Sequence, residues 1–239
     1  MFYDLYVHAS NSIGESTIED MASWAKQAGL DGIGIVYFPE QLQLRPVLPK
    51  ADVDLVSVCV IKAPGIAELE ERVARSRQKA EIIAVYGGDY DINRAACSNP
   101  AVDVLLHPEL GRHDSGLDHI CIHAAKENNV AIELNFHSLL ESYRKHRVSV
   151  LAAMRKNIML CRKYGAPIIV ASGSLSKWDL RSGRELASLA NLLGLELGKA
   201  IESVSTVPER IVAANREKLA GKRWEGVRVI EESEDAKGD

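Results

Sequence analysis

The 239-residue sequence lacks several patterns that would directly identify an enzyme or a membrane protein. It contains no GxGxxG, GxxxxGK[ST] or GxSxG motif, so a dinucleotide site, a P-loop and a serine hydrolase are not indicated. No apolar run approaches the length of about 20 residues that crosses a bilayer, and the first residues carry an acid rather than a basic leader. We therefore expect a cytoplasmic protein that contacts no membrane.

Cysteine is also scarce, and its spacing excludes two kinds of site. The four cysteines form no CxxC pair; they are Cys59, Cys97, Cys121 and Cys161. Scattered single cysteines argue against both a zinc cage and a disulfide framework. We expect reduced thiols in a hydrophobic core.

The net charge of −4 conceals a segregation along the chain. Residues 1–140 hold 11 Lys and Arg against 20 Asp and Glu, whereas residues 141–228 hold 17 against 8 and the last 11 residues hold 1 against 5. A concentrated positive surplus favours a polyanionic partner, although water-exposed helix faces are the more common reason for any single basic cluster.

Apolar runs bounded by turn residues alternate with segments of helical period, which is the pattern of a parallel sheet with crossover helices. Most runs are continuously apolar, as is typical of strands covered by helices on one side and by a packed barrel interior on the other. We predict an α/β fold, a TIM-like (β/α) barrel with about seven parallel strands. The predicted strands are residues 2–9, 32–37, 55–61, 82–87, 102–107, 130–136 and 167–172.

Local signals place the helices. Ser16 and Glu19 predict a capping box for the first helix, which Gly29 ends, and Asp114 and Ser115 predict a cap for a later one. Extra helices in the C-terminal third are expected at residues 138–146, 149–164, 182–192, 194–203 and 207–220. We expect one barrel domain, residues 1–230, and an acidic mobile tail, residues 231–239.

The candidate metal site is incomplete. In such barrels chemistry gathers at the carboxyl ends of the strands, where His8, His107 and Glu133 are expected to converge. Tyr6 stands where a metal centre would want a second histidine, and the strand ending at Ser172 brings no acid or histidine. We interpret the cluster as a set of partly satisfied polar groups in a barrel, with a metal site as the alternative.

Basic residues interleaved with aromatic ones are a more informative feature, and they occupy residues 142–147, 154–157, 161–167 and 172–186. Lys177, Arg181 and Arg184 are spaced to flank a helix N-terminus whose free N–H groups also favour phosphate. We expect Asp179 to cap that helix or to orient Arg181. The pattern is typical of a protein that recognises the sugar-phosphate backbone and the shape of an RNA, with little readout of its sequence.

Five segments carry a resemblance over nearly the whole chain. They are VDVLLHPELGRHDSGLDH at 102–119, ENNVAIELNF at 127–136, MRKNIMLCRKYGAPIIVASG at 154–173, KWDLRSGREL at 177–186 and STVPERIVAANREKL at 205–219. Together they resemble the archaeal ribonuclease P protein component 3 family. The resemblance implies a barrel related to the polymerase-and-histidinol-phosphatase (PHP) hydrolases, whose first strand carries an HxH pair. Tyr6 and His8 stand at those two positions.

The same resemblance implies a function. The chain would be a protein subunit of ribonuclease P, the endonuclease complex that removes the 5′ leader from precursor tRNA. The RNA subunit and its magnesium ions would carry the cleavage. The protein, without a cofactor or catalytic residue of its own, would bind the ribonuclease P RNA and a small RRM-like protein subunit and meet precursor tRNA through the complex. Motif membership and charge together predict RNA or partner contacts at Arg94, Arg112, Lys163, Lys177, Arg181 and Arg184. The alternative is a metal-dependent phosphoesterase of the PHP type that uses His8, His107 and Glu133.

Overall fold

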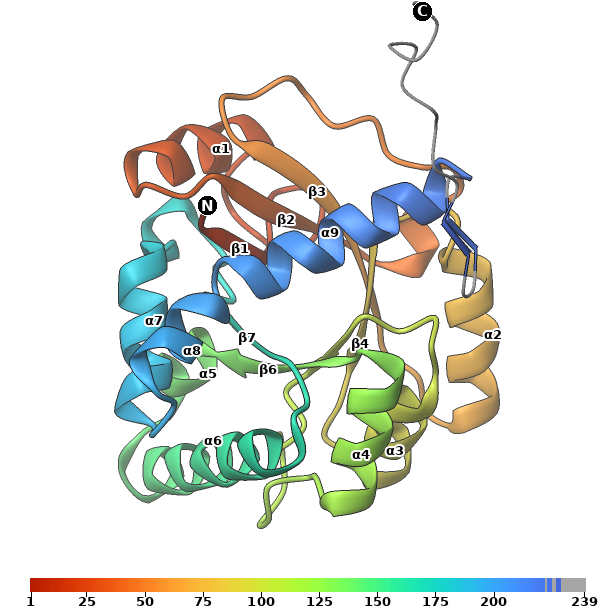
Figure 1. Cartoon of the computed structure of the whole chain (residues 1–239). Coiled ribbons are helices and arrows are strands. Elements are labelled where there is room, and N and C mark those ends of the chain that lie inside the picture. The colour runs from red at the N-terminus through yellow and green to blue at the C-terminus, as the bar shows by residue number, and fades with distance from the viewer. Residues whose placement is uncertain (222, 225–226, 229–239) are drawn as a thin grey trace, which may run out of the picture.

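The computed structural model describes residues 1–221, 223–224 and 227–228, so the expected acidic tail, residues 231–239, lies outside the described residues. One sheet of seven parallel strands in chain order curls into a barrel (Figure 1), which confirms the predicted fold class. The strands are β1 (Tyr3–Val7), β2 (Gly32–Tyr37), β3 (Asp54–Ile61), β4 (Ile82–Tyr86), β5 (Val104–Leu106), β6 (Ala131–Asn135) and β7 (Ile168–Ala171). A short antiparallel pair that the sequence did not predict, β8 (Arg223–Trp224) and β9 (Val227–Arg228), follows the barrel.

Helices surround the barrel and cover one of its ends. They are α1 (Ile18–Gln27), α2 (Ile66–Ser76), α3 (Tyr90–Ser98), α4 (His119–Asn128), α5 (Phe136–Glu141), α6 (Arg144–Tyr164), α7 (Gly183–Leu192), α8 (Leu197–Glu202) and α9 (Thr206–Leu219), with 3₁₀ turns η1 (Pro39–Gln41) and η2 (Lys177–Asp179). The predicted boundary between the helices at 138–146 and 149–164 was wrong. The chain breaks earlier, at Ser142 and Tyr143, so that α6 is longer than predicted. In the part of the chain that the structure describes, no helix has both the length and the apolar character that spanning a membrane requires.

The first and last strands of the barrel meet through few contacts. A single parallel bridge joins Val7 to Ser174, and the His8 backbone N–H donates to the Ser174 carbonyl at 2.9 Å. Nearer the start of β1, a side chain makes the link between the two strands. Asp4 Oδ1 accepts the backbone N–H of Ser172, directly after β7, at 3.1 Å. The carboxyl of Asp4 therefore closes the ring.

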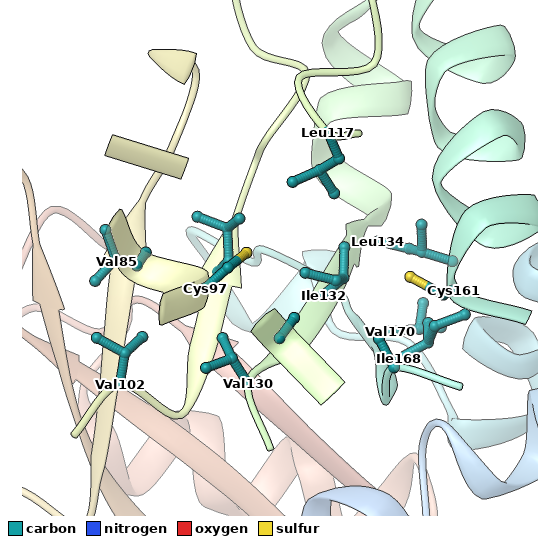
Figure 2. Packing of buried hydrophobic residues seen from close by; sticks show 14 of the residues in the cluster. Val85, Cys97, Val102, Leu117, Val130, Ile132, Leu134, Cys161, Ile168 and Val170 are labelled. Carbon is teal, nitrogen blue, oxygen red and sulfur yellow. The ribbon is translucent and has the colours of Figure 1, made fainter. Parts of the chain in front are cut away.

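Alternation along the strands divides the core into an inner and an outer layer. Inside the ring, Val56, Val58 and Val60 of β3 belong to one buried cluster. Outside it, side chains of β4, β6 and β7 pack against α3, α4 and α6, and Figure 2 shows Cys97 and Cys161 among the aliphatic residues of this outer layer. All four cysteines are free and buried, which confirms that they are core thiols.

The first helix begins one residue later than predicted. The hydroxyl of Thr17, rather than that of Ser16, accepts the first free N–H group of α1, from Asp20 at 3.1 Å. The Ser16 hydroxyl instead accepts the backbone N–H of Lys177 at 3.0 Å and so ties the β1–α1 loop to η2. A tertiary contact outweighs the local capping signal here.

Helix α9 covers the amino-terminal end of the barrel and crosses in front of β1 and β2 in Figure 1. Val212 of this helix joins the inner cluster. The guanidinium of Arg216 donates to both oxygens of Asp54 at 2.8 and 2.9 Å and to Glu81 Oε1 at 2.7 Å. These two acids stand near the starts of β3 and β4. One arginine thus fixes the helix to the barrel and neutralises a buried carboxylate.

Replacing Arg216 should weaken the fold measurably. Arg216→Ala leaves Glu81, whose side chain is only 7% exposed, without its closest cation. Because Arg216 itself is 39% exposed, we expect a loss of about 2 kcal/mol in the free energy of unfolding, below the range of about 3–5 kcal/mol for a fully buried pair. Urea denaturation measures the loss. Lys199→Ala breaks an exposed pair with Glu202 and should cost less than about 1 kcal/mol; equal losses in both variants would contradict this role of Arg216.

Candidate functional site

The mouth of the barrel, at the carboxyl ends of the strands, holds a cavity of about 320 Å³. Apolar and aromatic side chains make up much of its lining, and the polar residues among them are His8, His107, His137, His146, Glu109, Glu141 and Asn135. The opposite end of the barrel is covered by α9, so the cavity belongs to the mouth side alone. Sequence reasoning placed His8, His107 and Glu133 together here, and the structure does bring them together.

Two local irregularities aim the histidines into the mouth. The register between β1 and β2 slips by one residue between Asp4 and Val7. Tyr3 and Leu5 already face the interior, so without the bulge Tyr6 and His8 would point outward. Directly after β5, His107 follows the inward-facing Leu106, and its φ of +47° turns the ring inward instead of outward. Such a left-handed conformation is strained for a non-glycine residue and persists only where its surroundings impose it.

Hydrogen bonds fix the polar groups at the bottom of the mouth. Glu133 Oε2 accepts the backbone N–H of His107 at 3.2 Å, and Glu133 Oε1 accepts the Asn135 side-chain amide at 2.8 Å. The Asn135 oxygen accepts the Ser138 N–H, and the Ser138 hydroxyl is hydrogen-bonded to His107 Nδ1 at 3.2 Å. The cluster is therefore one connected network around a strained histidine.

Tyr6 occupies the space between the two histidines. Its ring centroid lies 4.9 Å from that of His8 and 5.6 Å from that of His107, both edge-on. The ring separates the two imidazoles, and His107 Nδ1 remains 3.8 Å from Glu133 Oε2, beyond a hydrogen bond. Among the described residues no three His, Cys, Asp or Glu side chains are arranged to hold a metal ion. The residues present do not fit the metal centre of a hydrolase.

Burial favours the uncharged form of the groups at the bottom of the mouth. It raises the pKa of Glu133 to about 8, of Glu109 to about 7 and of Asp4 to about 6. The same desolvation lowers the pKa of His8 and of His107 to about 4. Neutral imidazoles are the form of histidine that binds metals, but a Glu133 carboxyl that holds its proton at neutral pH is a poor ligand for a cation.

The loop of residues 107–118 forms part of the rim and is held from below. The buried Asn93 side chain donates to the carbonyls of Pro108 and Gly116 at 2.9 and 3.0 Å. Gly116 has φ of +73°, and a Cβ there would overlap the Pro108 carbonyl. Arg112 lies on this loop, but its guanidinium makes two hydrogen bonds to Asp114. The predicted cap at Asp114 was therefore wrong, since Asp118 caps α4 instead.

Three of the predicted contact residues lie between β7 and the first turn of α7. Lys177 lies 3.8 Å from Asp20, and Arg181 donates to the carbonyls of Trp178 and Leu180 and lies over the Phe136 ring. Arg184 is exposed in the first turn of α7. Asp179 accepts N–H groups from Leu175 and Ser176 and so caps η2, whereas Ser182 and Glu185 cap α7. The expected cap by Asp179 was assigned to the wrong helix.

The remaining predicted residues are distributed over the outside of the barrel. Arg94 is exposed on α3 and lines a shallow groove between α2 and α3. Lys163 is exposed at the C-terminal end of α6, which lies at the amino-terminal end of the strands because the crossover helices run antiparallel to them. The six residues therefore do not form one patch.

Comparison with solved structures defines the class of protein. Histidinol phosphate phosphatase from Lactococcus lactis, solved with zinc, L-histidinol and phosphate, superposes with a TM-score of 0.52 at 9% identity over 83% of this chain and 93% of its own. A Xaa-Pro dipeptidase superposes with a TM-score of 0.59, also at 9% identity, over 90% of this chain and 75% of its own. These likenesses concern the fold alone. The molecule is a (β/α) barrel with a tyrosine and buried polar groups around the cavity at its mouth.

Closer relatives define the family. The family model described as RNase P subunit p30 matches residues 1–220. Ribonuclease P protein component 3 from Methanosarcina barkeri is 36% identical over 98% of this chain and 97% of its own, and the one from Methanococcoides burtonii is 36% identical over 100% and 98%. A chain in the cryo-EM structure of archaeal ribonuclease P with mature tRNA is 25% identical, with a TM-score of 0.74 over 97% of this chain and 99% of its own. This chain belongs to the RNase P subunit p30 family and is a protein subunit of ribonuclease P.

The buried carboxyls predict how stability depends on pH. Glu109 keeps its proton in the folded state up to a pKa of about 7, whereas the unfolded chain releases it near the ordinary value of 4.5. The contribution of this group to stability is therefore lost as pH rises from about 4.5 through about 7. Glu109→Gln mimics the protonated form and should be more stable than the wild type at pH 8, by on the order of 1 kcal/mol or more.

Urea denaturation of both proteins at pH 5 and at pH 8 measures this difference. The advantage of Glu109→Gln should be small at the lower pH and larger at the higher one. Glu127→Gln, an exposed control on α4, should follow the wild type at both. Parallel pH profiles for Glu109→Gln and the wild type would disprove a buried Glu109 that keeps its proton.

Proposed function

We propose that this chain supports the RNA of ribonuclease P by direct contact, and that it does not cleave RNA itself. The observation that carries the proposal is the chain's membership of the RNase P subunit p30 family together with its uneven charge. Residues 141–228 hold 17 Lys and Arg against 8 Asp and Glu, in a chain whose net charge is negative. Phosphate contacts of Lys and Arg dominate affinity for nucleic acids.

The proposed substrate of the complex is precursor tRNA. Support comes from the related complex, which was solved with mature tRNA. Hydrolysis of a phosphodiester needs charge stabilisation at the leaving and attacking oxygens, which metal ions supply in many nucleases. We propose that magnesium ions bound by the RNA subunit supply it here. His107 and Glu133, at the bottom of the barrel mouth, are held in their neutral forms by burial and offer no such charge.

We propose RNA or partner contacts at the six residues singled out by sequence. Of the three candidates near the rim from Lys177 to Arg184, Arg184 is the strongest, because it is exposed, whereas Lys177 lies 3.8 Å from Asp20 and Arg181 donates to backbone carbonyls. Arg112 is the weakest, since Asp114 already takes up its charge. The partner protein that we propose is a small RRM-like subunit, and the support for it is family membership.

Recovery of RNA with the full-length chain tests this function. A tagged chain isolated from its own cells should carry one structured RNA of ribonuclease P type, identified by sequencing. Recovery of no such RNA would exclude the subunit role in that cell. The phosphoesterase alternative requires bound transition metal and turnover of a phosphoester by the protein alone; neither is expected, and His8→Ala should change neither.

A substitution at Arg184 tests whether the rim of the barrel mouth contacts RNA. Arg184→Gln should weaken binding of the full-length chain to the ribonuclease P RNA transcript and lower the slope of log affinity against log salt concentration by about 1, because one phosphate contact is lost. Fluorescence anisotropy at several salt concentrations gives both quantities. Arg75→Gln is the matched control, because Arg75 is similarly exposed on α2 but paired with Glu71. Identical curves for Arg184→Gln and the control would remove Arg184 from the RNA surface.

A further inference from the structure

Helix α6 has an unusual charge composition. It is 21 residues long, and its sequence RKHRVSVLAAMRKNIMLCRKY contains seven Lys and Arg but no Asp or Glu. At 1.5 Å per residue it spans about 31 Å. Solvent-exposed helices ordinarily interleave charges of both signs, since oppositely charged pairs three or four residues apart stabilise a helix and like-charged pairs destabilise it. A helix that omits every acid gives up this stabilisation.

The cations lie along the outer face of the helix. Its buried residues, Val150, Met154, Asn157, Ile158 and Cys161, form one stripe that packs against α4 and β6. Lys145, Arg155, Lys156 and Lys163 are exposed on the remaining surface. From Lys145 to Lys163 the basic face extends over about 27 Å. It therefore runs along most of one side of the barrel.

The positive charge of this face is not balanced by the protein. Within residues 1–221, none of the seven cations forms an ion pair. Arg147 donates to the carbonyls of Ser142 and Leu140, and Arg162 donates to that of Gly194. The charge of Lys156 helps to lower the pKa of Asp114, but that carboxylate is already held by Arg112. On α2, by contrast, Arg72 and Arg75 each pair with a glutamate four residues earlier.

The face also connects parts of the surface that are far apart. At its first turns α6 borders the mouth cavity, which His146 and Val150 line. Arg181, on the rim, lies over Phe136, the first residue of α5, which directly precedes α6. At its other end α6 carries Lys163. Helix α6 therefore runs from the rim near Arg181 to Lys163 at the opposite end of the strands.

We propose that the outer face of α6 lies along the sugar-phosphate backbone of an RNA. This inference rests on the proposed function and names the surface that performs it. The choice of RNA over a protein follows from the composition of the face, where Val148 and Met159 are the large exposed apolar side chains in α6 and cations flank them. Protein interfaces are depleted in lysine at their centres and built around apolar anchors, whereas a line of ammonium and guanidinium groups matches phosphates. A rigid helix also presents these groups without ordering a loop.

The test neutralises the middle of the helix. Arg155→Gln/Lys156→Gln removes two exposed cations whose side chains make no hydrogen bond within residues 1–221, and glutamine keeps much of the side-chain length and a good helix propensity. Full-length wild type and variant are titrated with ribonuclease P RNA transcript at several salt concentrations. We expect about tenfold weaker binding at low salt and a salt slope smaller by about 2, with an unchanged circular dichroism spectrum. Arg72→Gln/Arg75→Gln, which removes two paired cations from α2, is the control and should follow the wild type.

Each result has a distinct meaning. Wild-type affinity and slope in the α6 variant, with RNA binding intact, would overturn the α6 surface and leave the proposed function standing. If the wild-type chain itself failed to bind the transcript, the proposed function would fail and this inference with it. Loss of a protein subunit from the purified complex without a change in RNA affinity would assign the face to a protein. Should the double variant misfold, Lys145→Gln/Lys163→Gln at the ends of the helix is measured in the same way and must show the same weakening.

Discussion

The hydrogen bond from the Ser172 backbone to the buried Asp4 carboxyl is the contact on which the barrel depends. In this ring of seven parallel strands, one bridge at Ser174 and the Asp4 side chain span the gap between the first and last strands. Because the Asp4 carboxyl is fully buried, desolvation raises its pKa to about 6. The bulge that follows Asp4 then turns Tyr6 and His8 inward. The segment from Asp4 to His8 therefore both helps to close the barrel and determines which side chains line its mouth.

That arrangement explains why the described residues at the mouth of this (β/α) barrel lack the ligand geometry of a metal centre. A metal needs deprotonated carboxylates and imidazoles that converge on one point. Here the Tyr6 ring keeps the imidazoles of His8 and His107 apart, and desolvation keeps Glu133 protonated at neutral pH. The site is therefore a packed polar network that rigidifies the carboxyl end of the barrel, just as Arg216 rigidifies the other end. A rigid frame suits a subunit whose surface contacts a larger complex.

The sequence predicted the strands well because both faces of each strand are buried, and continuous apolar runs report that burial directly. It also predicted that His8, His107 and Glu133 lie at the same end of the barrel, since the carboxyl ends of parallel strands share one edge, but not that Tyr6 keeps the two imidazoles apart. Features that depend on distant residues were not predictable. Ser16 looks like a helix cap but binds the backbone of Lys177, which is 161 residues away, and the positive φ of His107 leaves no local signature. Such contacts are decided by tertiary packing rather than by neighbours in sequence.

The interior and the surface of the protein also differ in how their charges are balanced. Inside the barrel, acids such as Glu81 and Glu133 are either paired or held toward their neutral form, because an unpaired ion in a low-dielectric core is costly. On α6 the cost of leaving like charges together is smaller, since water and salt screen them, but the charges oppose folding as long as nothing binds there. The full set of cations remains on one helix while α2 pairs its arginines with glutamates. In the proposed complex, the phosphates of an RNA supply the negative charges that the sequence of α6 lacks.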